Sequence, residues 1–147
     1  MGYRSEVAYV IRFKNAEQRQ TFINLQRAKA DSHINGALDE LVEVEDNMLG
    51  YHAEYVKWYS DYPDVKAHET LMKDSIDLFG DDNPDTQAYN DQTGYRFIRL
   101  GEESDDNEDE ERGNSECLYE YVDWTKSITT AFTRNTYEAN QLNEGEK

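Results

Sequence analysis

The fold is decided by the stretch Glu6-Val7-Ala8-Tyr9-Val10-Ile11-Arg12-Phe13, near the start of the chain. Its residues alternate with the period of an extended strand, so one face carries Val7, Tyr9, Ile11 and Phe13. The other face carries Ala8, Val10 and Arg12 and is also largely apolar. Because a strand that is apolar on both faces has to be covered on both, we predict that it lies inside a sheet rather than at its edge.

Outward from this strand, capping residues predict two helices. Asn15 has the chemistry of a helix N-cap, and Gln18 follows at the capping-box spacing, so the first helix begins here and ends near Ala30. Pro63 suits the first turn of the second helix, and Gly80 suits its end. Strands are predicted over 41–45 and 48–59 between the helices, and over 95–100 and 118–124 after them.

The order strand, helix, hairpin, helix, hairpin predicts an α+β domain. We expect a mostly antiparallel sheet with two helices on one face, and a ferredoxin-like arrangement is the nearest common template. The domain is predicted to span residues 1–137 with an acidic loop over 101–116, where no apolar residue occurs before Cys117. Residues 138–147 are predicted to form a flexible polar tail.

Length and composition limit the possible functions. The chain has 147 residues, enough for one ordinary domain, and its 32 acidic and 15 basic residues give a formal net charge of −17. Aromatic residues make up 12%, which argues against a disordered chain. We do not expect ordinary binding to DNA, RNA or anionic lipid, because those ligands need a basic surface.

The compartment is predicted from what the sequence lacks. Cys117 is the single cysteine, so an intramolecular disulfide is impossible and a reducing environment is expected. The start of the chain carries no apolar signal-peptide core, and no stretch approaches the roughly 18–20 apolar residues of a membrane-spanning helix. We therefore expect a cytoplasmic protein without a membrane partner.

Charge is distributed unevenly along the chain. Residues 1–30 hold six basic and two acidic residues, whereas the rest of the chain holds nine basic and thirty acidic residues. The densest run, 102–111, has eight acidic residues in ten, and a smaller acidic patch precedes the strand predicted over 95–100. The candidate partner-binding residues are Glu102, Glu103, Asp105, Asp106, Glu108, Asp109, Glu110, Glu111, Asp81, Asp82, Asp85 and Tyr119.

The acidic run has two interpretations. Acidic runs are commonly solvated loops, and like charges favour disorder. Alternatively, in an extended run the alternate carboxylates lie about 6.6 Å apart, which is comparable with neighbouring phosphates of a nucleic-acid strand. In that case the run would occupy the basic groove of a nucleic-acid-binding protein.

Neither a catalytic nor a metal site is predicted. Asp105, Asn107, Asp109 and Glu116 match part of a calcium-loop pattern, but Glu110 stands where that loop needs glycine. The three histidines show no metal-ligand spacing, and no nucleotide-binding or nucleophile motif occurs. We therefore expect no catalytic residues, no metal and no cofactor.

Two short stretches carry a resemblance. Gly2-Tyr3-Arg4-Ser5, and Tyr95-Arg96-Phe97-Ile98-Arg99-Leu100-Gly101-Glu102-Glu103 before the acidic run, resemble small accessory proteins of tailed phages and prophages that begin Met-Gly-Tyr-Arg-Ser. The resemblance implies a phage origin and an accessory role, and it supplies neither an activity nor site residues.

The leading hypothesis combines this resemblance with the acidic surface. It holds that the protein is a phage accessory protein that binds and inhibits a host nucleic-acid-handling complex, such as a CRISPR effector, a restriction enzyme, a nuclease or RNA polymerase. The alternative is a structural or assembly module, joined into a homo-oligomer through an uncovered strand edge, whose acids only maintain solubility.

Overall fold

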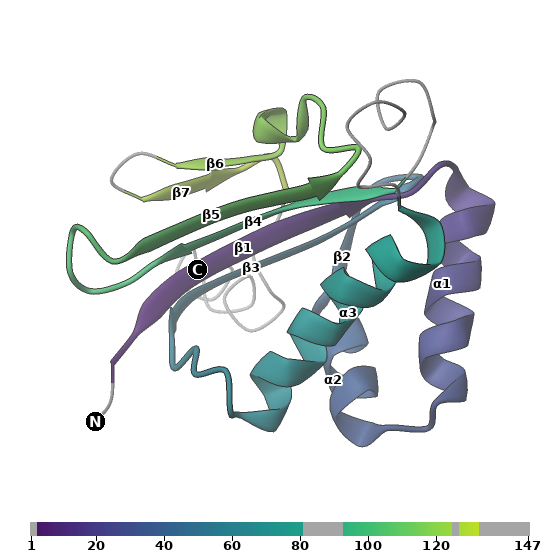
Figure 1. Ribbon diagram of the computed structural model, residues 1–147, viewed down its shortest axis with the longest axis horizontal. Helices are drawn as coiled ribbons and strands as arrows, with labels where there is room; N and C mark the ends of the chain where they lie inside the picture. The colour runs from purple at the N-terminus through teal and green to yellow at the C-terminus, as the bar shows by residue number, and fades with distance from the viewer. Residues whose placement is uncertain (1–2, 81–92, 125–126, 133–147) are drawn as a thin grey trace, which may run out of the picture.

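The computed structural model describes residues 3–80, 93–124 and 127–132, in which a five-stranded sheet is covered by three helices on one face and a small hairpin on the other (Figure 1). The elements are β1 (Ser5–Arg12), α1 (Ala16–Ala28), α2 (Ser32–Glu40), β2 (Val42–Glu45), β3 (Met48–Val56), α3 (Pro63–Phe79), β4 (Gly94–Leu100), β5 (Asn107–Gly113), a 3-10 helix (Leu118–Glu120), β6 (Val122–Trp124) and β7 (Ile128–Thr130).

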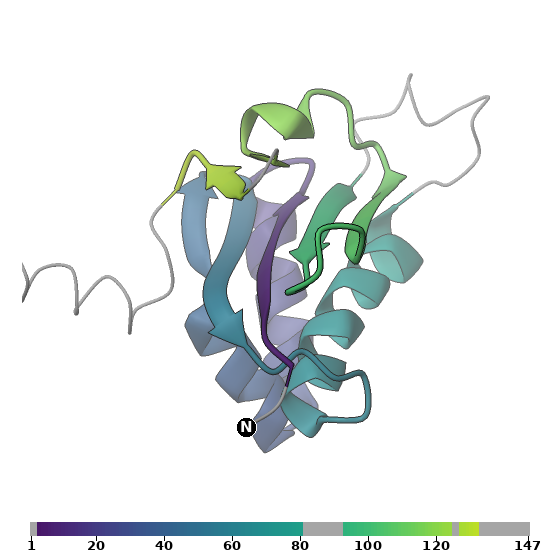
Figure 2. The same cartoon turned by 90° about the vertical axis from the view of Figure 1, so that its left-hand side faces the viewer.

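The sheet confirms the α+β prediction. Its strand order is β2-β3-β1-β4-β5, and every pairing between these strands is antiparallel. The first four strands along the chain have the split βαβ arrangement of ferredoxin-like folds, and β5 extends the sheet by one strand. β1 lies at the centre, as predicted from its two apolar faces, and β2 and β5 form the opposite edges (Figure 2).

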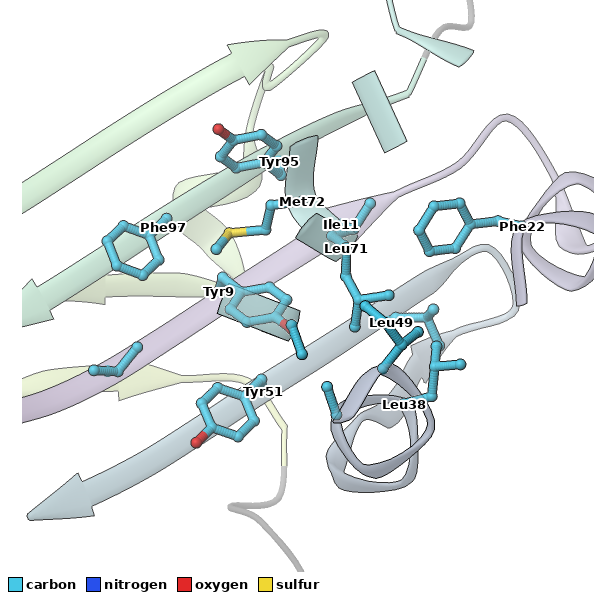
Figure 3. Packing of buried hydrophobic residues seen from close by; sticks show 14 of the residues in the cluster. Tyr9, Ile11, Phe22, Leu38, Leu49, Tyr51, Leu71, Met72, Tyr95 and Phe97 are labelled. Atoms are coloured by element: carbon cyan, nitrogen blue, oxygen red, sulfur yellow. The ribbon is translucent and has the colours of Figure 1, made fainter. Parts of the chain in front are cut away.

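The alternation of β1 divides the core into two layers. Val7, Tyr9 and Ile11 pack with residues of all three helices, and Figure 3 shows the aromatic side chains of this layer meeting between sheet and helices. Ala8 and Val10 face the other way and pack against the β6–β7 hairpin and the 3-10 helix. Both faces of β1 are therefore buried.

Local capping explains where α1 and α3 begin. The Asn15 side chain accepts a hydrogen bond from the Gln18 backbone N–H at 2.8 Å, as the spacing predicts. The Gln18 side chain accepts from the Lys14 N–H at 3.0 Å, one residue before the position expected in a capping box. Pro63 is the first residue of α3 and Gly80 its C-cap, so these predicted ends are confirmed.

The prediction of two helices is wrong, because α2 was not foreseen. α1 ends at Ala28, and Ala30 adopts a left-handed backbone with φ 54° that breaks the helix. Asp31 then caps α2 by accepting from the backbone N–H groups of His33 and Ile34 at 2.9 and 3.0 Å. α2 packs on α3 through its apolar stripe of Ile34, Ala37 and Leu38.

The prediction of an acidic loop over 101–116 is also wrong, because residues 107–113 form strand β5. Cross-strand attraction explains the pairing: Arg96 of β4 lies opposite Glu111, and Arg99 lies opposite Glu108. The predicted partner of β4, residues 118–124, instead forms the 3-10 helix and β6, and β6 pairs with β7. β3 ends at Val56, three residues before the predicted end at 59.

Three candidate residues, Asp81, Asp82 and Asp85, and the predicted tail 138–147 lie outside the described residues. Among the described helices, none combines the length and the apolar character that crossing a bilayer requires.

Candidate functional site

The acidic residues of β5 lie on an ordered strand at the edge of the sheet. Successive side chains of a strand point to opposite faces, so the run is divided between two surfaces. Glu108 and Glu110 lie on the helix side with Phe97, whereas Asp109 and Glu111 lie on the hairpin side with Ile98. On each face, neighbouring carboxylates are separated by about 6.6 Å of strand.

On the hairpin face, one guanidinium forms ion pairs with three carboxylates. Arg96 makes ion pairs with Asp109 at 3.0 Å, Glu111 at 2.7 Å and Asp123 at 3.2 Å. Its Nε donates to the Val122 carbonyl oxygen at 2.8 Å, and its side chain is only 10% exposed. Arg96 therefore fixes β6 against β4 and β5, and the acids of this face are part of the fold.

On the helix face, compensation is incomplete. Arg99 pairs with Asp106 at 2.6 Å and with Glu108, and these carboxylates raise its pKa. Glu110 accepts a hydrogen bond from the Tyr95 hydroxyl, and burial together with this bond raises the pKa of Tyr95. No ion pair to Glu110 is present within the described ranges.

The first described residues close one end of this surface. The Tyr3 hydroxyl donates to Asp106 at 2.6 Å and accepts from the Glu103 backbone N–H at 3.1 Å. The Arg4 backbone N–H donates to Glu102 at 2.8 Å. Hydrogen bonds from Arg99 and Tyr3 lower the pKa of the Asp106 carboxyl. The start of the chain and the turn between β4 and β5 thus form one unit, although about a hundred residues separate them.

A cleft of about 710 Å³ opens on the helix face. Its wall is built by the start of the chain, the loop after β3, α3, β4 and β5. The aromatic lining residues are Tyr3, Trp58, Tyr59, Tyr95 and Phe97, and the acidic ones are Asp61, Glu69, Asp106, Glu108 and Glu110. The cations in the wall are Arg99 and Lys73, and Lys73 is paired with Asp77.

The raised pKa of Glu69, a residue of α3, indicates a negative electrostatic potential in this cleft. Its pKa is raised, first because the cleft wall removes water from part of the carboxylate, then because Glu108 and Glu110 face it. Within the described ranges, the Glu69 carboxylate has no hydrogen bond or ion pair. Three carboxylates from two elements thus converge on one aromatic-lined space with too few cations to neutralise them.

The remaining candidate residues lie around the site but not in the cleft. Glu102, Glu103 and Asp105 are exposed in the turn between β4 and β5. Tyr119 belongs to the 3-10 helix that packs on β4 and β6, and its side chain is 55% exposed. Tyr119 therefore does not lie on the strand predicted over 118–124.

Sequence reasoning missed the role of Glu69 and a second cluster, Glu6–His52–Glu54. Glu69 sits on the polar side of α3, and no local pattern indicates that it faces β5. In the second cluster the potential ligand atoms lie within 4.8 Å of one another. One oxygen of Glu6 is 2.8 Å from His52 Nε2 and the other accepts from the Ile128 N–H at 3.1 Å, so this cluster ties β7 to β1 and β3.

The arrangement is suited to binding cations and basic side chains. The carboxylates around the cleft are charged acceptors over aromatic surface, and the edge strand beside them carries the same sign. Comparison of the chain with family models, with curated proteins and with solved structures finds no match. The proposed function is therefore derived from the acidic strand β5 and the cleft beside it.

Proposed function

We propose that the protein is a non-catalytic binding module that places its acidic β5 edge on the basic, nucleic-acid-binding surface of a partner protein and thereby competes with nucleic acid. The observation that carries this proposal is the strand itself, which presents four consecutive acidic residues, 108–111, at a sheet edge. Arg96 and Arg99 hold the flanking carboxylates in place from β4.

Rigid placement matters because a partner does not have to order the strand when it binds. Each side chain that becomes immobilised on binding costs about 0.5–1.5 kcal/mol, and a preformed acidic strand avoids part of that cost. The excess negative charge also steers a basic partner toward the surface, most strongly at low salt. Carboxylates spaced about 6.6 Å apart on each face suit a row of lysine and arginine side chains.

The kind of partner follows from the resemblance to phage accessory proteins. If this chain has such an origin, its partner is a nucleic-acid-handling complex of the host, and it acts in the host cytoplasm. The two stretches that carry the resemblance meet in the structure, where Tyr3 and Arg4 bind the turn that leads into β5. This contact supports a shared role for them in presenting the acidic strand.

A second candidate function is assembly into a homo-oligomer through a sheet edge. The edge that favours it is β2, a strand of four residues that, within the described ranges, pairs only with β3. Self-pairing of β5 is disfavoured, since antiparallel copies would place acidic residues opposite one another. In this case the acids of β5 protect that edge and maintain solubility.

Competition across a salt series tests the proposal. Purified nucleic-acid-binding complexes, RNA polymerase and a restriction endonuclease among them, are mixed with fluorescent duplex DNA and increasing amounts of the protein. We expect displacement of DNA from one of these complexes at about 50 mM salt and much weaker displacement at about 200 mM.

The variant Glu108→Gln/Asp109→Asn/Glu110→Gln/Glu111→Gln should lose this competition. The matched control, Glu45→Gln/Asp46→Asn/Glu116→Gln/Glu120→Gln, removes four exposed charges outside β5 and should retain it. Equal competition by the two variants, or no competition by the native protein with any complex, rejects the proposal. A concentration-dependent oligomer that persists in the β5 variant supports the assembly alternative.

A further inference from the structure

The aromatic cleft has a lining that selects the chemistry of its occupant. Tyr95 and Phe97 form a buried floor, with 3% and 8% of their surface exposed, and the Trp58 ring centroid lies 6.1 Å from that of Phe97. Glu69 stands on one side, and Glu108 and Glu110 stand on the other. An occupant therefore meets the partly exposed Trp58 ring, which packs above this floor, and carboxylates around it.

Three classes of occupant fit this lining poorly. A phosphate or carboxylate would be repelled by five acidic residues in the wall. A wholly apolar ligand would take water from those carboxylates without replacing their hydrogen bonds. A shared metal ion is disfavoured by distance, since among the described residues only Glu6, His52 and Glu54 bring three potential ligand atoms within 4.8 Å of one another.

A planar cation fits all three features of the site. A guanidinium stacks on aromatic rings, and its fixed fork of N–H groups matches carboxylate oxygens. The cavity of about 710 Å³ falls within the usual range of ligand sites, and it has room for an arginine side chain with its neighbouring residues. Glu69, which forms no hydrogen bond or ion pair among the described residues, supplies an acceptor that is not already engaged.

We propose that this cleft binds an arginine side chain of the partner, with the guanidinium stacked on the ring of Trp58 and held between Glu69 and the Glu108–Glu110 pair. The inference rests on the proposed function and names its recognition element: β5 supplies the charge that attracts a basic surface, and the cleft supplies the pocket that anchors one residue of it.

The two tryptophans provide an internal reference for the test. Trp58 lines the cleft, whereas the Trp124 indole N–H donates to Asp109 at 3.0 Å on the opposite face. Proton–nitrogen NMR spectra of the full chain resolve one indole signal for each. The probe is the peptide acetyl-Gly-Arg-Gly-amide, and the matched control contains citrulline, a neutral isostere of arginine.

We expect the arginine peptide to shift the Trp58 indole signal in a saturable manner and to leave that of Trp124 in place. The citrulline peptide should produce no such shift, and a lysine peptide should bind more weakly than the arginine peptide. The variant Glu108→Gln/Glu110→Gln should weaken arginine binding about tenfold, whereas Asp109→Asn/Glu111→Gln should change it less than about twofold.

Glu69→Gln separates binding from folding. Removing the repelled carboxylate should stabilise the fold while weakening arginine binding about threefold, so the weaker binding cannot be explained by unfolding. The inference is overturned if both indoles move equally, if citrulline binds as well as arginine, or if the two double variants weaken binding equally. Such results would show nonspecific attraction to the acidic surface.

Failure of this inference can be distinguished from failure of the proposed function. Suppose that the native protein displaces DNA from a complex and the β5 variant does not, while the arginine peptide fails to shift the Trp58 signal. The proposed function is then supported, and the inference that the cleft binds an arginine of the partner is wrong. If the peptide binds as expected but no complex is inhibited, the cleft binds arginine and competition with nucleic acid is wrong.

Discussion

The two faces of strand β5 carry the same kind of charge in different settings. On the hairpin face, the acids surround Arg96, whose guanidinium is nearly buried and also bonds the Val122 carbonyl. On the helix face, Arg99 is occupied by Asp106 and Glu108, while Glu69 and Glu110 form no ion pair among the described residues. On the first face every carboxylate around Arg96 is ion-paired to it and β6 is packed against the sheet, whereas the second face opens into a cleft where Glu69 and Glu110 have no ion pair among the described residues.

This difference teaches that acid density alone does not identify a binding surface. Half of the charge on β5 is used inside the molecule to attach the β6–β7 hairpin. The other half faces a cleft where it has too few partners. Of the two faces of β5, the helix face combines carboxylates that lack an ion pair among the described residues with a cleft. Structure and binding are therefore expected to separate along this division.

The largest effect is expected from Arg96→Met. Loss of the guanidinium leaves Glu111 and the Val122 carbonyl without this donor, and among the described residues Asp109 and Asp123 keep only their bonds from Trp124. It should lower the free energy of unfolding by about 2–3 kcal/mol. Urea titration followed by circular dichroism measures the change. The matched variant Arg99→Met should lose only about 1 kcal/mol, because within the described part of the chain Arg99 holds no backbone carbonyl of another strand comparable with the bond from Arg96 to Val122. Equal losses would remove the distinction between the two faces.

The next largest effect on stability is expected from removing the two acidic residues of one face of β5 at a time. Asp109→Asn/Glu111→Gln converts charge-assisted bonds to Arg96 into neutral ones and should lower stability by about 1–2 kcal/mol. Glu108→Gln/Glu110→Gln should cost less than about 0.5 kcal/mol, since the weaker bond to Arg99 is offset by relief of repulsion with Glu69. The same urea titration is used, and the reverse order of the two losses would contradict the comparison.

A smaller effect of opposite sign is expected from Glu69→Gln. The raised pKa means that the folded state binds a proton more readily than the unfolded state, so native stability falls as pH rises from the ordinary glutamate pKa through the raised one. The variant should be more stable at pH 7 by about 0.3–0.5 kcal/mol, a figure reduced for solvent screening. Thermal unfolding at pH 4 and pH 7 measures this, with Glu45→Gln as the control that should show no gain.

The smallest effect concerns Asp106, whose pKa is lowered by Arg99 and Tyr3. Its contribution to stability is fully present above the unfolded-state pKa of about 3.9 and is lost as pH falls through the lowered folded value. Asp106→Asn should therefore make the acid side of the stability profile shallower below about pH 4. An unchanged profile would show that the bonds to Arg99 and Tyr3 contribute nothing to acid stability.

Local sequence patterns predicted the elements whose signals lie within a few residues. The alternation of Val7, Tyr9 and Ile11 placed β1 inside the sheet, and Asn15 and Pro63 marked the starts of two helices. The signal for α2 is present too, in Asp31 followed by Ile34, Ala37 and Leu38, but no element was predicted between the first helix and the strand over 41–45. β7, with three residues, is too short to leave a periodic pattern.

The acidic run shows where local reasoning fails. Like charges in sequence predicted a loop, and the pattern held no sign that Arg96 and Arg99 would lie opposite Glu111 and Glu108. The cleft could not be predicted from local patterns either, since it brings together Tyr3, Trp58, Glu69 and Glu110 from four separate segments. The candidate acids were found from the sequence, whereas the division between structural and exposed ones was not.

The sequence by itself determined the central strand, the capped ends of two helices and the concentration of acid between residues 102 and 111, because periodicity, capping and charge act over neighbouring residues. Only the tertiary structure decided that acidic residues of this run form a strand, which of their carboxylates pair with Arg96 and which face the aromatic cleft. The physical reason is that strand pairing brings compensating charges from elsewhere in the chain, and strand alternation then sends adjacent side chains to opposite faces of the sheet.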